Sequence, residues 1–193
     1  IVGQAPDSIV SHGAGWARIV KNGRPGNIVT LHTWPQAYAF QAVDRDASKA
    51  EHGGDRYRRM EIEYICSHTI ATQSDAGQQL WMMMGDFNSR SRRDNRVYNY
   101  PDDDTRLLVH DYIAEHTPYV DVIAEKHPGE FHTTTHGQSR IDFVYCTQPL
   151  CERITRAEVI VDDFTEPVRD PGKLSNFYHP SDHRPILVDF DMK

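Results

Sequence analysis

The chain has 193 residues, of which 38% are hydrophobic and 25% charged, so its composition is that of a folded globular protein and excludes a disordered chain. Its formal net charge of −7 excludes a broadly basic surface for binding nucleic acid, although it leaves room for a local basic site. No run approaches the roughly 18 apolar residues of a membrane span, and three irregularly spaced cysteines do not form a disulfide scaffold or a CxxC metal site.

The first elements in chain order are two strands and a helix. Apolar and β-branched residues at 15–20 and 27–34 predict strands, and the Asn-Gly and Pro-Gly steps of KNGRPG between them predict a turn. From about Ser48 to Thr72, apolar residues recur at helical intervals among charged ones, which predicts an amphipathic helix. Gly53 and Gly54 are expected to delay its start.

The second half of the chain continues the alternation of strands and helices. Residues 79–84 predict a buried strand, followed by a polar, arginine-rich loop to about Asp103. Asp104 is a suitable cap for a helix over 105–116, and a long Pro- and Gly-containing loop covers 164–181. The class is therefore α/β or α+β, with sheet packed against helices. Further strands are expected at 140–146, 156–163 and 184–190.

Polar residues stand at the ends of three of these strands, in the segments GDFN (85–88), SRID (139–142) and SDHRP (181–185). Asp142 would lie inside an apolar strand, where an unpaired carboxylate is costly. His183, beside Asp182, is the natural partner, and Arg140 is the alternative. Convergence of these segments in one cleft suits phosphate-ester hydrolysis, which needs a positioned water, a base, and a cation or imidazole to stabilise the phosphoryl oxygens.

These three segments, in this order and spacing, resemble the endonuclease/exonuclease/phosphatase superfamily. The resemblance implies a DNase I-like α/β sandwich of two β-sheets flanked by helices. It also implies that Asp86 orients or deprotonates the attacking water, that Asn88 helps to hold this water, and that His183 contacts the scissile phosphate. Asp142 would orient His183, Asp182 would serve a metal site, and His32, at the end of an earlier strand, would be a second phosphate-contacting imidazole.

The sequence departs from the family at its beginning. The family opens with a strand that carries an Asn, followed by one that ends in a metal-ligating Glu, and neither is found here. Glu51, Glu61 and Glu63 fall in the helix after His32, which is the wrong place in the order. We therefore expect residues 1–193 to form a single domain that lacks the N-terminal part of the family fold. The chain is then a fragment, a subunit completed by a second polypeptide, or a shortened relative with altered metal binding.

Several other side chains are candidates for substrate binding. Arg90 and Arg92 begin a basic run that would suit a second phosphate or a neighbouring nucleotide, although a solvated surface is the alternative. Trp34 and Tyr38, just past His32, would flank the substrate or stack a base, or else pack in the core. His132 and His136 have a metal-like i, i+4 spacing, but Thr and Gly around them favour a solvated loop.

The sequence thus predicts a phosphoester hydrolase dependent on Mg²⁺, with Mn²⁺ as the alternative cation, and preferably a phosphodiesterase or nuclease. The substrate class includes nucleic acid, phospholipid and inositol phosphate. The competing prediction is a degenerate relative that binds a phosphorylated ligand or partner without turnover. No feature of the sequence indicates a compartment.

Overall fold

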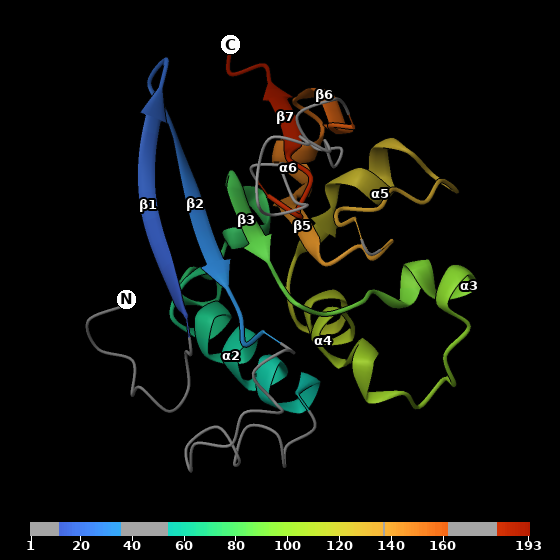
Figure 1. Ribbon diagram of the computed structural model, residues 1–193. Helices are drawn as coiled ribbons and strands as arrows, with labels where there is room; N and C mark the ends of the chain where they lie inside the picture. Colours follow the sequence, from blue (N-terminus) through green and yellow to red (C-terminus); the bar gives the residue numbers. More distant parts are fainter. Residues whose placement is uncertain (1–11, 36–53, 137, 162–180) are drawn as a thin grey trace, which may run out of the picture.

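The computed structural model describes residues 12–35, 54–136, 138–161 and 181–193. Within them the chain forms a five-stranded sheet of order β1-β2-β3-β5-β4 and a two-stranded sheet of β6 and β7. Strands β2 and β3 are parallel, while the other neighbouring pairs are antiparallel (Figure 1). The strands are β1 (Gly13–Lys21), β2 (Arg24–His32), β3 (Trp81–Asp86), β4 (Tyr119–Asp121), β5 (Asp142–Thr147), β6 (Ile154–Val159) and β7 (Ile186–Phe190).

The helices lie on both sides of the larger sheet. None of the described helices is long and apolar enough to cross a membrane. The α-helices are α2 (Asp55–Ser67), α3 (Asn95–Tyr98), α4 (Leu108–His116), α5 (Val122–Lys126) and α6 (Gln148–Cys151). Single 3-10 turns are η2 (Ile70–Thr72), η3 (Ala76–Gln78), η4 (Arg92–Asp94) and η5 (Thr105–Leu107).

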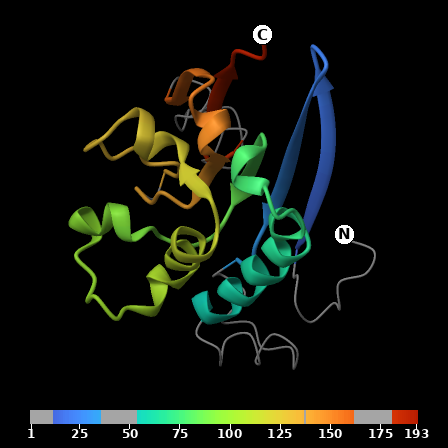
Figure 2. The same cartoon turned by 180° about the vertical axis from the view of Figure 1, so that it is seen from behind.

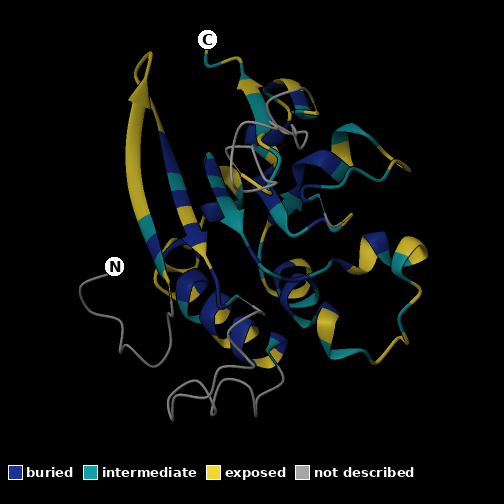
Figure 3. Cartoon of the chain, in the orientation of Figure 1, coloured by how far each residue is buried: buried dark blue, intermediate teal, exposed yellow. Residues whose placement is uncertain are grey.

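The predicted hairpin of β1 and β2 is confirmed, but the expected turn at the Pro-Gly step and the expected end of the second strand at residue 34 were wrong, because β2 runs from Arg24 to His32. Lys21 pairs with Arg24, so the turn consists of Asn22 and Gly23 alone. Both have positive φ, 53° and 76°, which is the conformation of a type I′ turn and explains the Asn-Gly pair. Much of β1 is exposed, as its colouring in Figure 3 shows.

Two apolar clusters pack on opposite faces of the larger sheet. On one face, α2 and α4 cover β2, β3 and β5, as Figure 2 shows from behind, and Ile62 and Met83 are fully buried there. On the other face, α5, α6 and β6 pack against β5 through residues such as Cys146 and Ile123. Because successive side chains of a strand point to opposite faces, β5 contributes Phe143 to the first cluster and Cys146 to the second.

Some element boundaries differ from those expected. The first helix begins at Asp55, after Gly54, and ends at Ser67, so the prediction that it reaches Thr72 was wrong; its expected start at 48–53 lies outside the described residues. The polar side chain of Thr69 and a 3-10 turn end the helix, because Thr69 Oγ1 donates to the carbonyl of Ile65. Asp104 does cap the following helical segment, accepting a hydrogen bond from the Arg106 backbone N–H.

The sequence patterns did not predict several short elements, among them β4, α5 and α6, which have three to five residues each. Of the later strands, the one expected at 156–163 is Ile154–Val159, with 162–163 outside the described residues. The one expected at 140–146 begins at Asp142, so this carboxylate stands at the start of the strand and not inside it. The position matters, because a strand end is open to the cleft and a strand interior is not.

A buried ion cluster lies beside the start of β5. The guanidinium of Arg140 donates to Asp94 over 3.1 Å and to Asp121 over 2.5 Å, and it lies 4.4 Å from the centre of the Phe143 ring. The three charged side chains are only 2–5% exposed. Arg140 is therefore not the partner of Asp142. Its ion pairs with Asp94 and Asp121 join the η4 segment and β4 to the residues that precede β5.

Candidate active site

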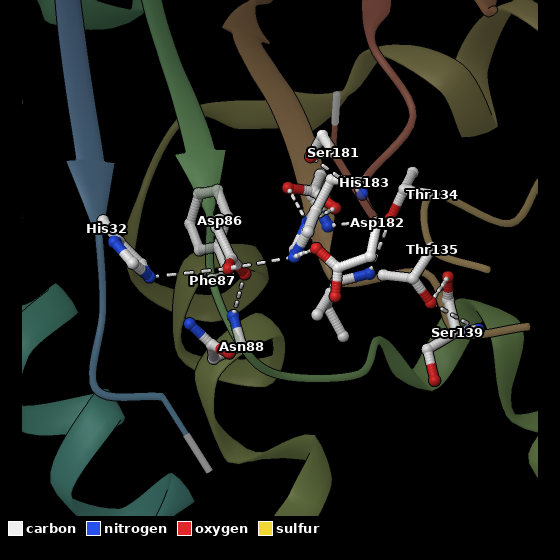
Figure 4. Close-up of polar contacts among 12 residues, drawn as sticks. His32, Asp86, Phe87, Asn88, Thr134, Thr135, Ser139, Ser181, Asp182 and His183 are labelled. Atoms are coloured by element: carbon white, nitrogen blue, oxygen red, sulfur yellow. Dashed lines mark hydrogen bonds and ion pairs between the residues drawn. The ribbon is translucent and has the colours of Figure 1, made fainter. Parts of the chain in front are cut away.

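Strand register brings three of the predicted residues into one row. In the parallel pair β2–β3, His32 is opposite Asp86, and in the antiparallel pair β3–β5, Asp86 is opposite Asp142. Gly85, with φ of 147°, lets the strands meet, since a Cβ there would lie 1.9 Å from the carbonyl oxygen of Leu31. The ends of β2 and β3 thus lie beside the beginning of β5, and their polar side chains face one cleft (Figure 4).

His183 completes the row from the segment before β7. Its Nδ1 lies 3.0 and 2.9 Å from the two oxygens of Asp142, so Nδ1 carries a proton that it donates to this carboxylate. The hydrogen bond to Asp142 raises the pKa of His183 to about 9. Its Nε2 points toward Asp86 and lies 4.0 Å from Oδ2 of that residue. At neutral pH the imidazole is therefore a cation with an Nε2–H donor facing the cleft.

Asp86 is fixed by the loop that it begins. Its Oδ1 accepts a 2.8 Å hydrogen bond from the Asn88 backbone N–H, while its Oδ2 lies 3.5 Å from Nε2 of His32. Burial, together with the nearby charge of Asp142, raises the pKa of Asp86. A carboxylate whose pKa is raised is a better proton acceptor when ionised, which is the property a general base requires.

The residues after Asp86 are held by contacts that the sequence did not reveal. Asn88 adopts a left-handed conformation with φ of 48°, and its side-chain Nδ2 donates to the carbonyl of Thr33 over 3.2 Å. Phe87 is fully buried, and Ser89 donates to Asp55 over 2.8 Å. The loop is thus held to the segment after β2 and to α2, which favours a fixed geometry for Asp86 and Asn88.

A second set of contacts fixes Asp142 and His183. The hydroxyl of Thr134 accepts a hydrogen bond from the backbone N–H of Asp142 over 3.1 Å. The carbonyl of Thr134 accepts one from the backbone N–H of Arg184 over 2.7 Å. Thr135 forms an isolated β-bridge with His183. The segment FHTTTHGQ (131–138) suggested only its two histidines as candidates, and its run of three Thr residues was the overlooked signal for these contacts.

Two cavities near the sheet can be compared as substrate sites. One of about 370 Å³ is lined by Asp86, Asp142 and His183, with apolar walls from Met84 and Ile186. A larger groove of about 820 Å³ beside the β1–β2 hairpin has Arg and Gln side chains and no carboxylate or imidazole in its lining. Because hydrolysis needs a base and a proton donor, the smaller cavity is the candidate site.

The other predicted residues lie at varying distances from this row. Asp182 is 78% exposed, and its Oδ1 lies 3.9 Å from Nε2 of His183. Arg90 donates to Ser139 over 3.1 Å and lies over the Tyr98 ring, at the edge of the loop that holds Thr134.

The two remaining substrate-binding candidates are engaged elsewhere. Arg92 is bound to Asp111 on α4, with its closest nitrogen–oxygen distance 2.7 Å. Trp34 is only 3% exposed and lies edge-on to Tyr57, so its ring is part of the core; its backbone N–H donates to Glu61, which is fully buried.

Tyr38, also considered for substrate stacking, lies outside the described residues. His136 donates its backbone N–H to the Asp182 carbonyl, and its i, i+4 relation to His132 forms no metal-ligand group among the described residues.

The donor atoms of the row are compatible with a divalent cation. Ligand atoms of Asp86, Asp142 and His183 all lie within 4.8 Å of one another. Oδ1 of Asp86 accepts from the Asn88 backbone, so its Oδ2 faces the cleft, and the exposed carboxylate of Asp182 lies 3.9 Å from Nε2 of His183. Mg²⁺ is usually held by one or two carboxylates, with water and substrate phosphate oxygens as the other ligands, so this donor set fits it.

Solved structures share this arrangement of sheets and helices. One is an AP endonuclease from Archaeoglobus fulgidus, with a TM-score of 0.59 and 18% identity over 92% of this chain and 65% of that chain. Another is the 3′ phosphatase NExo from Neisseria bound to a product DNA hairpin, with a TM-score of 0.54 and 13% identity over 91% and 64%. A third is an endonuclease/exonuclease/phosphatase family protein from Leptotrichia buccalis, with a TM-score of 0.50 and 16% identity over 93% and 54%.

The chain therefore has the DNase I-like fold of the endonuclease/exonuclease/phosphatase proteins, and the resemblance predicted from its sequence is confirmed at the level of the fold. It spans between 54% and 65% of the length of these three structures. No protein-family model and no curated protein matches the sequence.

Proposed function

We propose that the chain carries the catalytic side chains of a divalent-metal-dependent phosphoester hydrolase, preferably a phosphodiesterase or nuclease. The observation that carries the proposal is the convergence of Asp86, Asp142 and His183 on one cavity, with the two imidazole nitrogens of His183 directed at different carboxylates. A partly buried row of acid and base groups that face a cleft is typical of a catalytic site.

In this mechanism Asp86 takes a proton from the attacking water. Its Oδ1 is held by the Asn88 backbone, so Oδ2 is the oxygen that faces the cleft and accepts the proton. His183 donates from Nε2 to a phosphoryl oxygen as negative charge develops on it. Asp142 holds the imidazole in the required tautomer and keeps it protonated. His32, which is half exposed beside Asp86, is placed to contact a second phosphoryl oxygen.

Asp182 is the proposed ligand of the cation, with Mg²⁺ preferred and Mn²⁺ as the alternative, since Oδ2 of Asp86 serves as the proton acceptor. When bound, such an ion supplies charge stabilisation to the phosphoryl oxygens. Asp142 is less suited to this role because both of its oxygens accept from His183. The cation would also relieve the repulsion between Asp86 and Asp142, which is one cause of the raised Asp86 pKa.

A nucleic-acid substrate is preferred over a phospholipid or an inositol phosphate. The AP endonuclease and the DNA-bound 3′ phosphatase among the structural neighbours support this choice. Arg90, whose guanidinium is held by Ser139 and lies over the Tyr98 ring, is the candidate for a second phosphate contact. The proposal makes no use of Arg92 or Trp34, whose side chains are engaged elsewhere.

Full activity is proposed to depend on a further segment. The structural neighbours are longer than this chain, and the resemblance implies an Asn strand and a Glu metal ligand that the sequence lacks. Such a segment would belong to a longer form of the protein or to a second chain. Measuring the intact mass of the protein from its natural source, with any bound polypeptide, would test this dependence.

The experiment that tests the proposal is a cleavage assay on fluorescent DNA duplexes, with and without an abasic site, in Mg²⁺ and in EDTA. We expect Mg²⁺-dependent cleavage that falls by at least about 10²-fold in His183→Ala. The matched control is His116→Ala, which removes a histidine that is 54% exposed on α4, and it should leave the rate unchanged. Full activity of His183→Ala would refute the site assignment.

The alternative function is a module that binds a phosphorylated ligand without turnover, and the missing Glu ligand is what favours it. Under this alternative, the protein in its natural assembly would bind DNA but would not cleave it in Mg²⁺ or Mn²⁺. His183→Ala would then have little effect on DNA binding. A Mg²⁺-dependent rate that is lost in His183→Ala would exclude the alternative.

A further inference from the structure

We propose that the loop after α5 is a second metal site, formed by His127, Glu130 and His132, and that it binds Zn²⁺ or a similar transition-metal ion. The Oε2 atom of Glu130 lies 3.1 Å from Nε2 of His132 and 4.0 Å from Nδ1 of His127. Potential ligand atoms of the three residues all lie within 4.8 Å of one another. In Figure 1 the loop follows α5 at the outer edge of the ribbon, apart from the end of β3.

The hydrogen bond of His127 fixes which nitrogen is available to a metal. Its Nε2 lies 2.7 Å from the carbonyl oxygen of Ala157 on β6. A carbonyl oxygen only accepts, so Nε2 carries the proton and Nδ1 presents its lone pair toward Glu130. A metal-bound histidine commonly donates its other ring N–H to a carbonyl or carboxylate, which sets the tautomer and the ring orientation. His127 has this arrangement.

The backbone holds the three residues in a compact turn. The His127 N–H donates to Ile123 over 2.9 Å and closes the end of α5, and the Glu130 N–H donates to the His127 carbonyl over 3.1 Å. Gly129 has φ of 83°, and its carbonyl accepts a hydrogen bond from Arg96. The ligand atoms therefore require only small side-chain rotations to surround an ion.

The donor set distinguishes this site from the one at Asp86. Two imidazoles and one carboxylate suit Zn²⁺, whereas Mg²⁺ prefers oxygen ligands alone. In a tetrahedral zinc site with bonds of about 2.0–2.2 Å, the ligand atoms lie about 3.4 Å apart. The measured separations of 3.1 and 4.0 Å are close to this value. The side chains of His127 and Glu130 are 31% and 62% exposed, so a fourth position is open to water.

An ion at this site would stabilise the segment that supports the catalytic row. His132 is followed directly by Thr133, Thr134 and Thr135. Thr134 binds the backbone of Asp142, and Thr135 is bridged to His183. His127 in turn joins the same loop to β6. The proposed role of the ion is therefore structural: it fixes the start of the chain that holds the two catalytic residues.

The test is a titration of the protein with Zn²⁺ in the presence of saturating Mg²⁺, followed by equilibrium dialysis and measurement of bound zinc. We expect one Zn²⁺ per chain in the wild type, and binding at least about tenfold weaker in His132→Ala and in Glu130→Gln. The control His116→Ala should bind like the wild type. Co²⁺, used as a coloured substitute, should give visible absorption bands in the wild type and the control only.

Thermal unfolding gives a second readout that does not depend on hydrolysis. At Zn²⁺ about 100-fold above its dissociation constant, Tm should rise on the order of 5 °C in the wild type and should not rise in His132→Ala. His132 is the preferred variant because His127 also contacts Ala157, so its removal alters packing as well. Equal zinc binding by the wild type, His132→Ala and Glu130→Gln would overturn the proposal and leave the hydrolase proposal unaffected.

Discussion

Two clusters of charged side chains meet near the start of β5, one at Arg140 and one at Asp142, and they differ in their contact with solvent. In one, Arg140 is enclosed between Asp94 and Asp121, with all three side chains 2–5% exposed. In the other, His183 lies between Asp142 and Asp86, with side-chain exposures of 32%, 18% and 17%. Each has one cation and two carboxylates. All three residues of the second cluster line the cavity of about 370 Å³, whereas in the first cluster Asp121 borders a cavity of about 270 Å³ and neither Arg140 nor Asp94 is among the described residues that line it.

The difference separates a structural use of charge from a chemical one. A buried ion pair is costly to disrupt because removing one partner leaves an uncompensated charge away from water. In the Arg140 cluster, short hydrogen bonds join segments that are far apart in the sequence. In the His183 cluster, one contact is short and the other is 4.0 Å long, so Asp86 keeps an oxygen available to a water molecule, a cation or a substrate. Changes to the first cluster should therefore reduce stability, and changes to the second should reduce activity.

The largest effect is expected for Arg140→Met. The substitution leaves Asp94 and Asp121 buried without a cation, so the free energy of unfolding should fall by about 3–5 kcal/mol. Urea unfolding followed by circular dichroism measures this change. His183→Gln is the control and should lose less than about 1 kcal/mol, because its cluster is solvated. Equal losses in the two variants would show that the clusters do not differ in the way proposed.

The next effect is expected for Asp142→Asn. An asparagine does not stabilise the imidazolium of His183, so hydrolysis should fall by about 10²-fold at neutral pH. The pKa of His183, followed by NMR, should fall from about 9 toward its ordinary value of 6.5. Asp103→Asn, at an exposed position, is the matched control. An unchanged His183 pKa in Asp142→Asn would mean that the Asp142 contact does not keep the imidazole protonated.

A smaller effect concerns stability as a function of pH. Folding raises the pKa of His183 from 6.5 to about 9, so the stabilisation by its Asp142 partner is fully present below pH 6.5 and is lost as the pH rises through about 9. Because His183 is partly exposed, the effect should be on the order of 1 kcal/mol. The measurement is the difference in unfolding free energy between the wild type and Asp142→Asn in metal-free buffer. A difference that grows as the pH rises from 6.5 to 9 would contradict this assignment.

The sequence predicted the row of Asp86, Asp142 and His183 better than the charges that support it. Asp86 follows a run of apolar residues and was expected at the end of its strand, whereas Asp142 was expected inside a strand and stands at the start of one; strand pairing brings the two together. Their role in a reaction remains a prediction. The hairpin was also predictable, since Asn22 and Gly23 are suited to its turn.

One of the remaining features depends on contacts between distant segments, and another was overlooked within a single loop. The sequence offered Arg140 as a partner for Asp142, two residues away, whereas its actual partners Asp94 and Asp121 are 46 and 19 residues away. Local spacing could not predict this result, because it depends on how distant segments pack around Arg140. His132 was considered only with His136, but the loop turns so that it lies against Glu130 and near His127, which are close to it in the sequence.

The smallest effect is expected for Arg92→Gln, which breaks an ion pair with good geometry on the surface. Arg92 makes hydrogen bonds to both oxygens of Asp111, and the hydrogen bond raises its pKa, but its side chain is 43% exposed. Water solvates both charges after the change, so stability should fall by about 0.5 kcal/mol or less. Urea unfolding and steady-state hydrolysis of DNA measure the two consequences. A stability loss near that of Arg140→Met would show that hydrogen-bond geometry outweighs burial. A raised KM with unchanged stability would instead support the predicted contact of Arg92 with substrate, and would mean that its bond to Asp111 opens when substrate binds.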